Sequence, residues 1–350
     1  MLNQFNPKGF TPLVVQPKVL SDEWKTWIGE NIVLGNDPHK IVNTLMAQGL
    51  DRYSAQKEVL EALHSPYTKA ATRSVQALKK LESHLKIYTQ LQKLSPKSSR
   101  IDRVETITPQ EFLEKYYVTN TPLIMTGMMK NWQALSKWTP QYFADNFGDV
   151  VVSIQTNRST NPLYEIESEK HRSEMTLKAY VDLILQHSPT NDFYMTANNG
   201  NLDRPEFKPL FADMELFPGL CKQEECPGAI FFWLGPQGTI TPLHHDPCNL
   251  MMAQVYGRKK WQIISPHYTP QMYNYRGVFS AVDLTNPDYD RYPLFREVHI
   301  IEEVLEPGDL IFMPVGWWHF VEALDISISV SMTHFVFPNS YNWDYPNSKI

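Results

Sequence analysis

The stretch TPLHHDPCNLMMAQVYGRKKW, residues 241–261, places two adjacent histidines and an aspartate ahead of a run of bulky apolar residues. The apolar run is typical of a buried strand. Residues i and i+2 of a strand point to the same face, so His244 and Asp246 share a face while His245 points to the opposite one. An imidazole and a carboxylate side by side can ligate one metal ion. The stretch therefore predicts two metal ligands, with His245 as a less favoured alternative to His244.

A third ligand has a candidate in EPGDLIFMPVGWWHF, residues 306–320. This segment predicts a tight turn, a buried strand and a second turn that ends at His319. A distant strand can return beside the first one in a rolled-up sheet, which would bring His319 to His244 and Asp246. Two histidines and one carboxylate on one face leave coordination positions open, the pattern of the facial triad of non-haem Fe(II) oxygenases. The other histidines have no partner at ligand spacing and are interpreted as surface or core residues.

An open Fe(II) site also needs a source of electrons, and the commonest one is 2-oxoglutarate. Its distal carboxylate would need a buried cation. After the turn VYGRKKW the chain re-enters as a strand with Lys259 and Lys260 on opposite faces, so one lysine can point inward and the other outward. The residues alone do not decide between the two. Hydroxyl groups of Thr241 and Tyr194 are candidates to complete the pocket.

Composition narrows the class of protein. The 350 residues carry a net charge of −6, are 42% hydrophobic and 12% aromatic, and so indicate a globular protein. An acidic balance argues against a nucleic-acid binder. No apolar run is long enough for a membrane span, and the start lacks the pattern of a signal peptide. Three cysteines argue against a disulfide framework and for a reducing compartment, so we expect a cytoplasmic location. A half zinc site at Cys221 and Cys226 is disfavoured because no second pair exists.

The first hundred residues predict helices, with Ser21, Asp37 and Asp51 as caps and a long helix from Tyr67 to Leu94. A polar, proline-containing segment near residue 100 divides a helical region, 1–98, from a second domain, 99–350. There the pattern predicts a helix and then many short strands joined by Pro/Gly turns, typical of a sandwich or barrel. The predicted strands are DVVVSIQTN, DFYMTANN, AIFFWLG, TITPLHHD, LMMAQVYG, KKWQIIS, DLIFMPV and ISISVSM.

The long helix has two features of its own. Its leucines, from Leu78 to Leu94, form one stripe that could pack on the rest of the chain or on a second copy. Between residues 65 and 103 there are nine Lys or Arg against Glu82 and Asp102. A solvated helix face is the simpler interpretation of these charges, and a docking surface for an acidic partner is the alternative. We expect a homodimer from the stripe.

Three segments together resemble the JmjC, or cupin-8-like, branch of the Fe(II)- and 2-oxoglutarate-dependent oxygenases. They are WLGPQGTITPLHHDPCNLMMAQVYGRKKW, VDLTNPDYDRYPLF and LEPGDLIFMPVGWWHFVEALDISISVSM. The resemblance covers roughly residues 100–337, and within the branch the chain is similar to the single-domain asparaginyl and arginyl protein hydroxylases. It implies a mainly β fold with flanking helices, a double-stranded β-helix (jelly-roll) core, and Fe(II), 2-oxoglutarate and O2 as cofactor and cosubstrates.

The resemblance also implies roles for single residues. His244, Asp246 and His319 fall on the iron ligands. Lys259, Thr241 and Tyr194 fall on the residues that hold the distal carboxylate of 2-oxoglutarate, Ser331 on a small polar residue near it, and Trp233 on a tryptophan that lines the active site. Close relatives of the branch carry an asparagine where this chain has Leu250. The preceding residue, Asn249, would face the other side and is not assigned to the site.

The expected reaction is hydroxylation of an amino-acid side chain in a protein, a peptide or a free amino-acid-like metabolite, with release of succinate and CO2. Two alternatives remain open at this point: a cupin-type metal-binding module without oxygenase turnover, and a JmjC lysine demethylase. No nucleic acid and no membrane are expected as partners.

Overall fold

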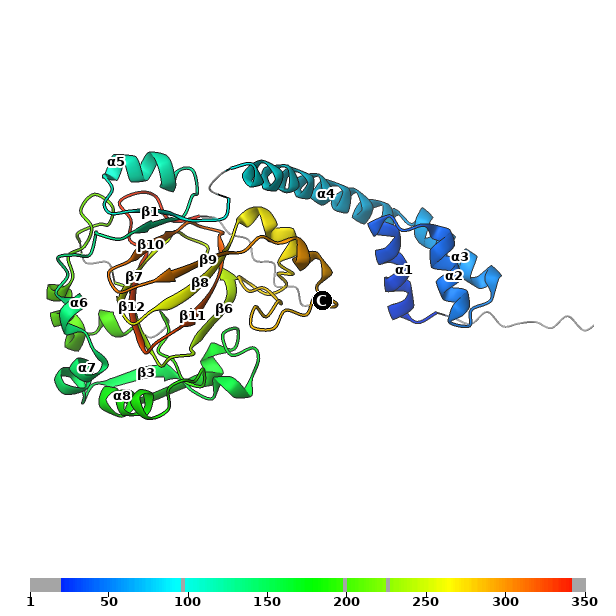
Figure 1. The fold of residues 1–350 in the computed structure, drawn as a ribbon. Coiled ribbons are helices and arrows are strands. Elements are labelled where there is room, and N and C mark those ends of the chain that lie inside the picture. Colours follow the sequence, from blue (N-terminus) through cyan, green and yellow to red (C-terminus); the bar gives the residue numbers. More distant parts are fainter. Residues whose placement is uncertain (1–19, 96–97, 198–199, 225–226, 342–350) are drawn as a thin grey trace, which may run out of the picture. The chain divides into compact units, whose positions relative to one another are not determined.

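The computed structural model describes residues 20–95, 98–197, 200–224 and 227–341 (Figure 1). The chain divides into two compact units, Met1–Ile87 and Tyr88–Ile350. Helix α4 (Pro66–Lys93) crosses this division. The domain limits taken from the sequence, 1–98 and 99–350, stay a prediction. None of the described helices is long and apolar enough to cross a membrane.

The N-terminal unit is helical, as expected. Helices α1 (Asp22–Leu34), α2 (Pro38–Ala47) and α3 (Arg52–His64) share a small core made by Leu20, Ile28, Ile32, Ile41, Leu45, Ala55 and Val59. The predicted caps hold at Asp37 and Asp51, whose carboxylates accept backbone N–H groups of the first turn. Ser21 occupies the N-cap position of α1, but its hydroxyl donates to Glu23 instead.

The second unit is built on two sheets that pack face to face (Figure 1). The larger sheet has six strands in the order β1-β2-β10-β7-β12-β5, and apart from the parallel pair β1 and β2 its strands are antiparallel. Its strands are β1 (Asp102–Val104), β2 (Leu123–Met125), β5 (Ile230–Gly235), β7 (Leu250–Tyr256), β10 (Leu310–Met313) and β12 (Ser327–Met332).

The smaller sheet has four antiparallel strands in the order β6-β11-β8-β9. They are β6 (Ile240–His245), β8 (Lys259–Ile264), β9 (Ile301–Leu305) and β11 (Trp318–Ala323). Strands that are distant in the chain are neighbours in both sheets, which is the winding of a jelly roll. The expected fold class, a double-stranded β-helix core with flanking helices and a helical N-terminal region, is confirmed.

Apolar side chains fill the space between the two sheets. Met252 and Ile311 of the larger sheet join Trp261, Ile263 and Val321 of the smaller sheet in one buried cluster. Side chains alternate along β12, since Ile328, Val330 and Met332 belong to the separate core on the outer face of the larger sheet. The serines of β12 point to the inside and are buried.

Helices cover the outer face of the larger sheet and complete its core. They are α5 (Pro109–Phe112), the π-helix η1 (Leu113–Tyr117), α6 (Ala134–Lys137), α7 (Pro140–Phe147) and α8 (Leu177–Gln186). A two-stranded sheet, β3 (Val151–Gln155) with β4 (Arg172–Thr176), continues from the β5 edge through bridges at Tyr194 and Met195. The predicted strand DFYMTANN is thus reduced to two bridging residues.

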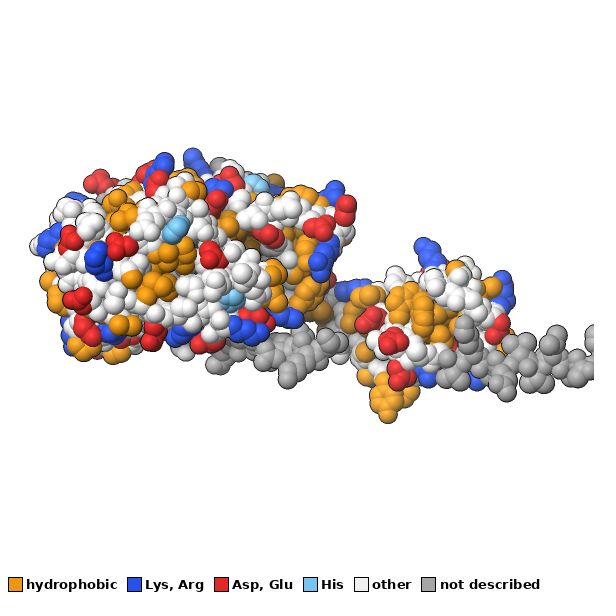
Figure 2. All heavy atoms as spheres, turned by 90° about the horizontal axis from the view of Figure 1, so that it is seen from below, with side chains coloured by type: hydrophobic (Ala, Val, Ile, Leu, Met, Phe, Trp, Pro, Cys, Tyr) orange, Lys and Arg blue, Asp and Glu red, His pale blue; other side chains and the backbone are white. Residues whose placement is uncertain are grey.

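Short 3-10 helices occupy the connections. They are η2 (Arg158–Thr160), η3 (Ser168–His171), η5 (Asn201–Asp203), η6 (Pro205–Asp213), η7 (Pro266–Gln271) and η8 (Pro293–Glu297). The face of the molecule drawn in Figure 2 carries acidic and basic side chains interspersed.

Candidate active site

Adjacent strands bring the three predicted metal ligands together. Strands β6 and β11 are antiparallel neighbours, and His319 stands directly opposite His244 in their register. Asp246 follows β6 by one residue, and its Oδ2 lies 3.5 Å from Nε2 of His319. One ligand atom from each of the three side chains lies within 4.8 Å of the other two. Their convergence is what a single bound ion requires.

Both imidazoles are held in the same way. Nδ1 of His244 donates to the carbonyl of Pro242 at 2.8 Å, and Nδ1 of His319 donates to the carbonyl of Trp317 at 3.0 Å. A carbonyl oxygen can only accept, so each Nδ1 carries the proton and each Nε2 keeps its lone pair. A hydrogen bond of this kind fixes the tautomer and the orientation of a metal-binding histidine. The donor set therefore fits a divalent transition metal such as Fe(II).

Burial shifts the pKa values of two side chains of the cluster, Asp246 and His319, toward their neutral forms. It raises the pKa of the Asp246 carboxyl, against the opposing effect of His244. Burial, followed by the proximity of His244, lowers the pKa of His319 well below its ordinary value. The indole of Trp261 stacks on the His319 ring at 5.5 Å between centroids and contributes to that burial. Neutral histidine is the form that ligates a metal.

His245 points away from this cluster. It is 4% exposed and packs edge-on against Trp318 at 4.6 Å, on the outer face of the smaller sheet. Burial lowers the pKa of His245 to about 4, so it is a neutral core residue at physiological pH. His245, the less favoured alternative for the first ligand, therefore faces away from the other ligands, as the two-residue period of a strand predicts.

The inward lysine is Lys259. It is 2% exposed, and its Nζ donates to the hydroxyl of Tyr194 at 3.0 Å. Among the ion pairs formed by described residues none includes Lys259, and burial lowers its pKa to about 7. Lys260 faces the other way and pairs with Glu322 at 2.9 Å near the surface. A buried ammonium group without a carboxylate partner is a fitting receptor for the distal carboxylate of 2-oxoglutarate.

The other expected pocket residues surround Lys259. Its Nζ lies 5.6 Å from the ring centroid of Tyr194 and 5.7 Å from that of Trp233. The Trp233 indole donates to Ser331 Oγ at 2.9 Å, which joins β5 to β12. Burial raises the pKa of Tyr194, and the charge of Arg158 and then contacts with Thr241 oppose that effect. All five side chains assigned to the cosubstrate and substrate pockets are thus neighbours.

Asn249 has a structural task instead. Its Oδ1 accepts the backbone N–H of Val315, and its Nδ2 donates to the Tyr341 hydroxyl. Leu250 belongs to the apolar cluster between the sheets. Asn249 therefore bonds to the loop at Val315 and to Tyr341, and it is not assigned to the site.

One loop returns to the metal site from the connection between β8 and β9. His245 N–H donates to the carbonyl of Val278, and Ser280 N–H donates to that of Leu243. The ring of Phe279 lies 5.8 Å from the ring of His244. Residues 278–280 therefore form an additional edge on β6 beside a metal ligand. The sequence did not reveal this pairing.

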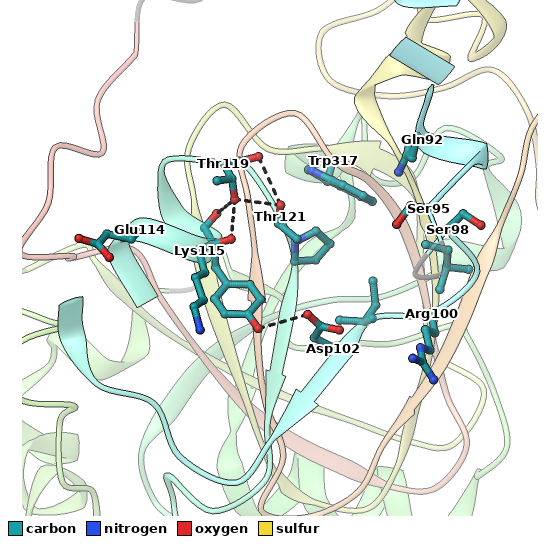
Figure 3. A pocket seen from close by; sticks show the side chains of 14 residues that line it. Gln92, Ser95, Ser98, Arg100, Asp102, Glu114, Lys115, Thr119, Thr121 and Trp317 are labelled. Carbon is teal, nitrogen blue, oxygen red and sulfur yellow. Dashed lines mark hydrogen bonds between the residues drawn. The ribbon is translucent and has the colours of Figure 1, made fainter. Parts of the chain in front are cut away.

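A separate hollow of about 600 Å³ lies near the start of β11 (Figure 3). Its lining includes Trp317, Asp102, Tyr116, Gln92, Ser95, Ser98 and Arg100. In it the hydroxyl of Tyr116 donates to Asp102 at 3.2 Å. None of the metal or cosubstrate residues lines it. Trp317 borders the hollow with its side chain while its carbonyl holds His319.

Residues 109–340 match the family model described as a cupin-like domain. The chain belongs to this cupin-like family, in its JmjC-type oxygenase branch. The cofactor and cosubstrates of that branch are Fe(II), 2-oxoglutarate and O2, and the histidine–aspartate–histidine cluster is suited to the iron.

Curated relatives of this cupin-like protein match at 27–29% identity. They include "Lysine-specific demethylase 8" of Xenopus tropicalis, 28% identical over 63% of this chain and 50% of that protein. "Lysine-specific demethylase JMJ30" of Arabidopsis thaliana is 28% identical over 66% of this chain and 54% of its own length. "HSPB1-associated protein 1" of Homo sapiens is 28% identical over 66% and 51%, respectively. The chain spans about half the length of these relatives.

Proposed function

We propose that this cupin-like protein is an Fe(II)- and 2-oxoglutarate-dependent dioxygenase that hydroxylates an amino-acid side chain. The substrate is a protein, a peptide or a free amino-acid-like metabolite. In the balanced reaction one C–H bond, 2-oxoglutarate and O2 give an alcohol, succinate and CO2. The observation that carries the proposal is the pairing of a facial histidine–aspartate–histidine cluster with a buried lysine that has no carboxylate partner among the described residues.

Each group of site residues would have a defined role in this reaction. His244, Asp246 and His319 would hold Fe(II), which with 2-oxoglutarate and O2 supplies an oxidant strong enough for an unactivated C–H bond. Lys259 and Tyr194 would bind the distal carboxylate of 2-oxoglutarate and orient it toward the metal. The indoles of Trp233 and Trp261 exclude water beside these groups.

The experiment is a turnover assay followed by mass spectrometry. Purified protein with Fe(II), ascorbate and 2-oxoglutarate should form succinate slowly even without substrate. Incubation with cell lysate or candidate peptides should then yield products heavier by one oxygen atom. A wild-type protein that binds Zn or Mn and never turns over 2-oxoglutarate would instead be a cupin-type metal-binding module.

Lysine demethylation is the second candidate, and the names of two relatives, both called lysine-specific demethylases, favour it. The same oxidant hydroxylates an N-methyl group, and the product then loses formaldehyde. The two activities differ in their products: a stable gain of oxygen marks side-chain hydroxylation, whereas formaldehyde and a peptide that has lost its methyl group mark demethylation. A methyl-lysine peptide and its unmethylated form make a matched pair of probes.

A further inference from the structure

Arg158 is a fully buried cation behind the cosubstrate pocket that the sequence did not reveal. It begins the 3-10 helix η2, separated by two residues from the end of β3, and is 0% exposed. Its Nη2 donates to Glu165 Oε1 and to the carbonyl of Ile240, both at 2.7 Å. The guanidinium carbon lies 4.3 Å from the ring centroid of Tyr164 and 5.1 Å from that of Tyr194.

Burying the guanidinium of Arg158 carries an energetic cost that its contacts offset only in part. A guanidinium removed from water needs a counter-ion and hydrogen bonds for its N–H groups. Glu165 supplies the counter-ion, but Nε and Nη1 have no hydrogen-bond partner among the described residues. A buried polar group left unsatisfied costs about 1–3 kcal/mol. A shorter apolar side chain would remove the unsatisfied N–H groups but would leave Glu165 and the carbonyl of Ile240 without this donor.

Arg158 contacts the same phenol ring as Lys259. The Tyr194 ring lies 5.1 Å from the guanidinium, and its hydroxyl accepts a hydrogen bond from Lys259 Nζ at 3.0 Å. Tyr194 is 2% exposed, so two cations fix a ring that has no freedom to swing into solvent. Because Glu165 pairs with Arg158, the short-range contact of the guanidinium with the Tyr194 ring matters more than long-range attraction.

We propose that Arg158 is a positioning residue for the cosubstrate pocket, acting through the ring of Tyr194. The planar guanidinium sets the angle of the phenol so that its hydroxyl and the ammonium of Lys259 converge on one distal carboxylate. The inference rests on the proposed function, because it assigns 2-oxoglutarate to this pocket.

The test measures binding to the full chain loaded with Mn(II), by titration calorimetry. The ligands are 2-oxoglutarate and oxalate, which also chelates the metal but lacks the distal carboxylate. Arg158→Met should raise the Kd of 2-oxoglutarate about 10-fold, equivalent to about 1.4 kcal/mol, and change that of oxalate less than about 2-fold. In turnover, the KM for 2-oxoglutarate should rise while kcat stays nearly constant.

A matched control is Arg103→Met. Arg103 also donates to carboxylates, those of Glu303 and Asp309, but on β1, at the opposite edge of the larger sheet from β5. The Arg103→Met variant should keep the wild-type Kd values for 2-oxoglutarate and for oxalate. Where Arg158→Met does not fold, Arg158→Lys keeps a cation without the plane and should still weaken 2-oxoglutarate selectively.

A double-mutant cycle with Tyr194→Phe tests the route of action. If Arg158 acts through the phenol hydroxyl, its substitution adds little once that hydroxyl is gone. Strictly additive effects, or equal weakening of oxalate and 2-oxoglutarate, would overturn the proposal for Arg158 alone. A wild-type protein that binds oxalate but not 2-oxoglutarate would overturn the proposed function and this inference together.

Discussion

Each metal-binding imidazole is oriented by the carbonyl two residues before it on its own segment of chain. Pro242 serves His244 in this way, and Trp317 serves His319. The orientation is therefore local, and it does not depend on the partner ligand. A site preorganised in this manner should lose affinity in steps as single ligands are removed, without a change of fold.

We expect His319→Ala to abolish succinate formation and to weaken Fe(II) binding by more than about 100-fold, beyond the loss typical of outer-shell substitutions. Metal analysis after dialysis and a succinate assay provide the measurements. His245→Phe is the control, since His245 packs on Trp318 away from the cluster. Should the two variants retain the metal equally, the triad assignment is wrong.

Lys259 should take up a proton when 2-oxoglutarate binds. Its pKa of about 7 means that the free group loses its proton above pH 7, and a bound dianion restores the charged form. Affinity for 2-oxoglutarate should therefore fall by up to about 10-fold per pH unit as pH rises above 7. Calorimetry in buffers of different ionisation enthalpy measures the proton taken up on binding. If the wild type takes up no proton, the assignment of Lys259 as the receptor for 2-oxoglutarate is contradicted.

The same lysine should lower the stability of the free protein. Its folded pKa lies below the ordinary value of 10.5, so the unfolded state binds the proton more tightly. The destabilisation is fully present below pH 7 and disappears as pH rises toward 10.5. Lys259→Met should thus raise the Tm at pH 6 while removing 2-oxoglutarate binding, and a lower Tm at that pH would speak against this account.

At the scale of elements, strands with alternating or continuous apolar residues were predictable. Strands β5, β6, β7, β8, β10 and β12 lie where the pattern places them. Strand β9, with the sequence IEEVL, was not predicted because its edge position leaves Glu302 exposed and breaks the apolar run. Edge strands commonly carry charge.

Arg103 links the edges of the two sheets. It lies on β1 and donates to Glu303 and to the carbonyl of Val304 on β9, and also to Asp309. We expect Arg103→Met to lower the free energy of unfolding by about 1–2 kcal/mol, a value reduced because the arginine is partly exposed. Urea denaturation measures this change in the free energy of unfolding. Arg296→Met, which removes an exposed pair with Asp290, should change stability by less than about 0.5 kcal/mol.

At the scale of the whole molecule, helix α4 exposes most of its apolar stripe, although Tyr88 stacks on the ring of His267 and Gln92 contacts the same imidazole. None of its described residues is buried, and Leu78, Leu81, Leu91 and Leu94 are each more than half exposed. Figure 2 shows hydrophobic side chains on the surface of the N-terminal unit as well. We propose, from the leucine stripe, that α4 contributes to a homodimer.

Light scattering with size exclusion tests the dimer. The full chain should have twice the monomer mass, whereas Leu81→Glu should shift it toward the monomer because a charge would be buried in the contact. Lys80→Glu, one residue away on another face, is the control for charge alone. A full chain that is monomeric at micromolar concentration would refute the proposal.

The period of two along β6 predicted the shared face of His244 and Asp246. The choice of Lys259 over Lys260, and the other pocket residues, followed only from the resemblance to the JmjC branch. Arg158 could not be predicted, because no motif marks it and its contacts with Ile240 and Tyr194 exist only after the loop that follows β3 has folded. The pairing of residues 278–280 with β6 was hidden for the same reason. Local pattern predicts which face a side chain takes, but not which distant loop meets it.

The three metal ligands and Lys259 belong to the neighbouring strands β6, β11 and β8 and the residue that follows β6. By contrast, Phe279 reaches His244 from a long irregular connection. Under the proposed function, oxygen activation would depend on the strands, whereas residues 278–280 belong to an irregular connection beside the site. We therefore expect relatives with insertions in this connection to differ in substrate while they keep the iron and 2-oxoglutarate residues, which a comparison of their substrates would test.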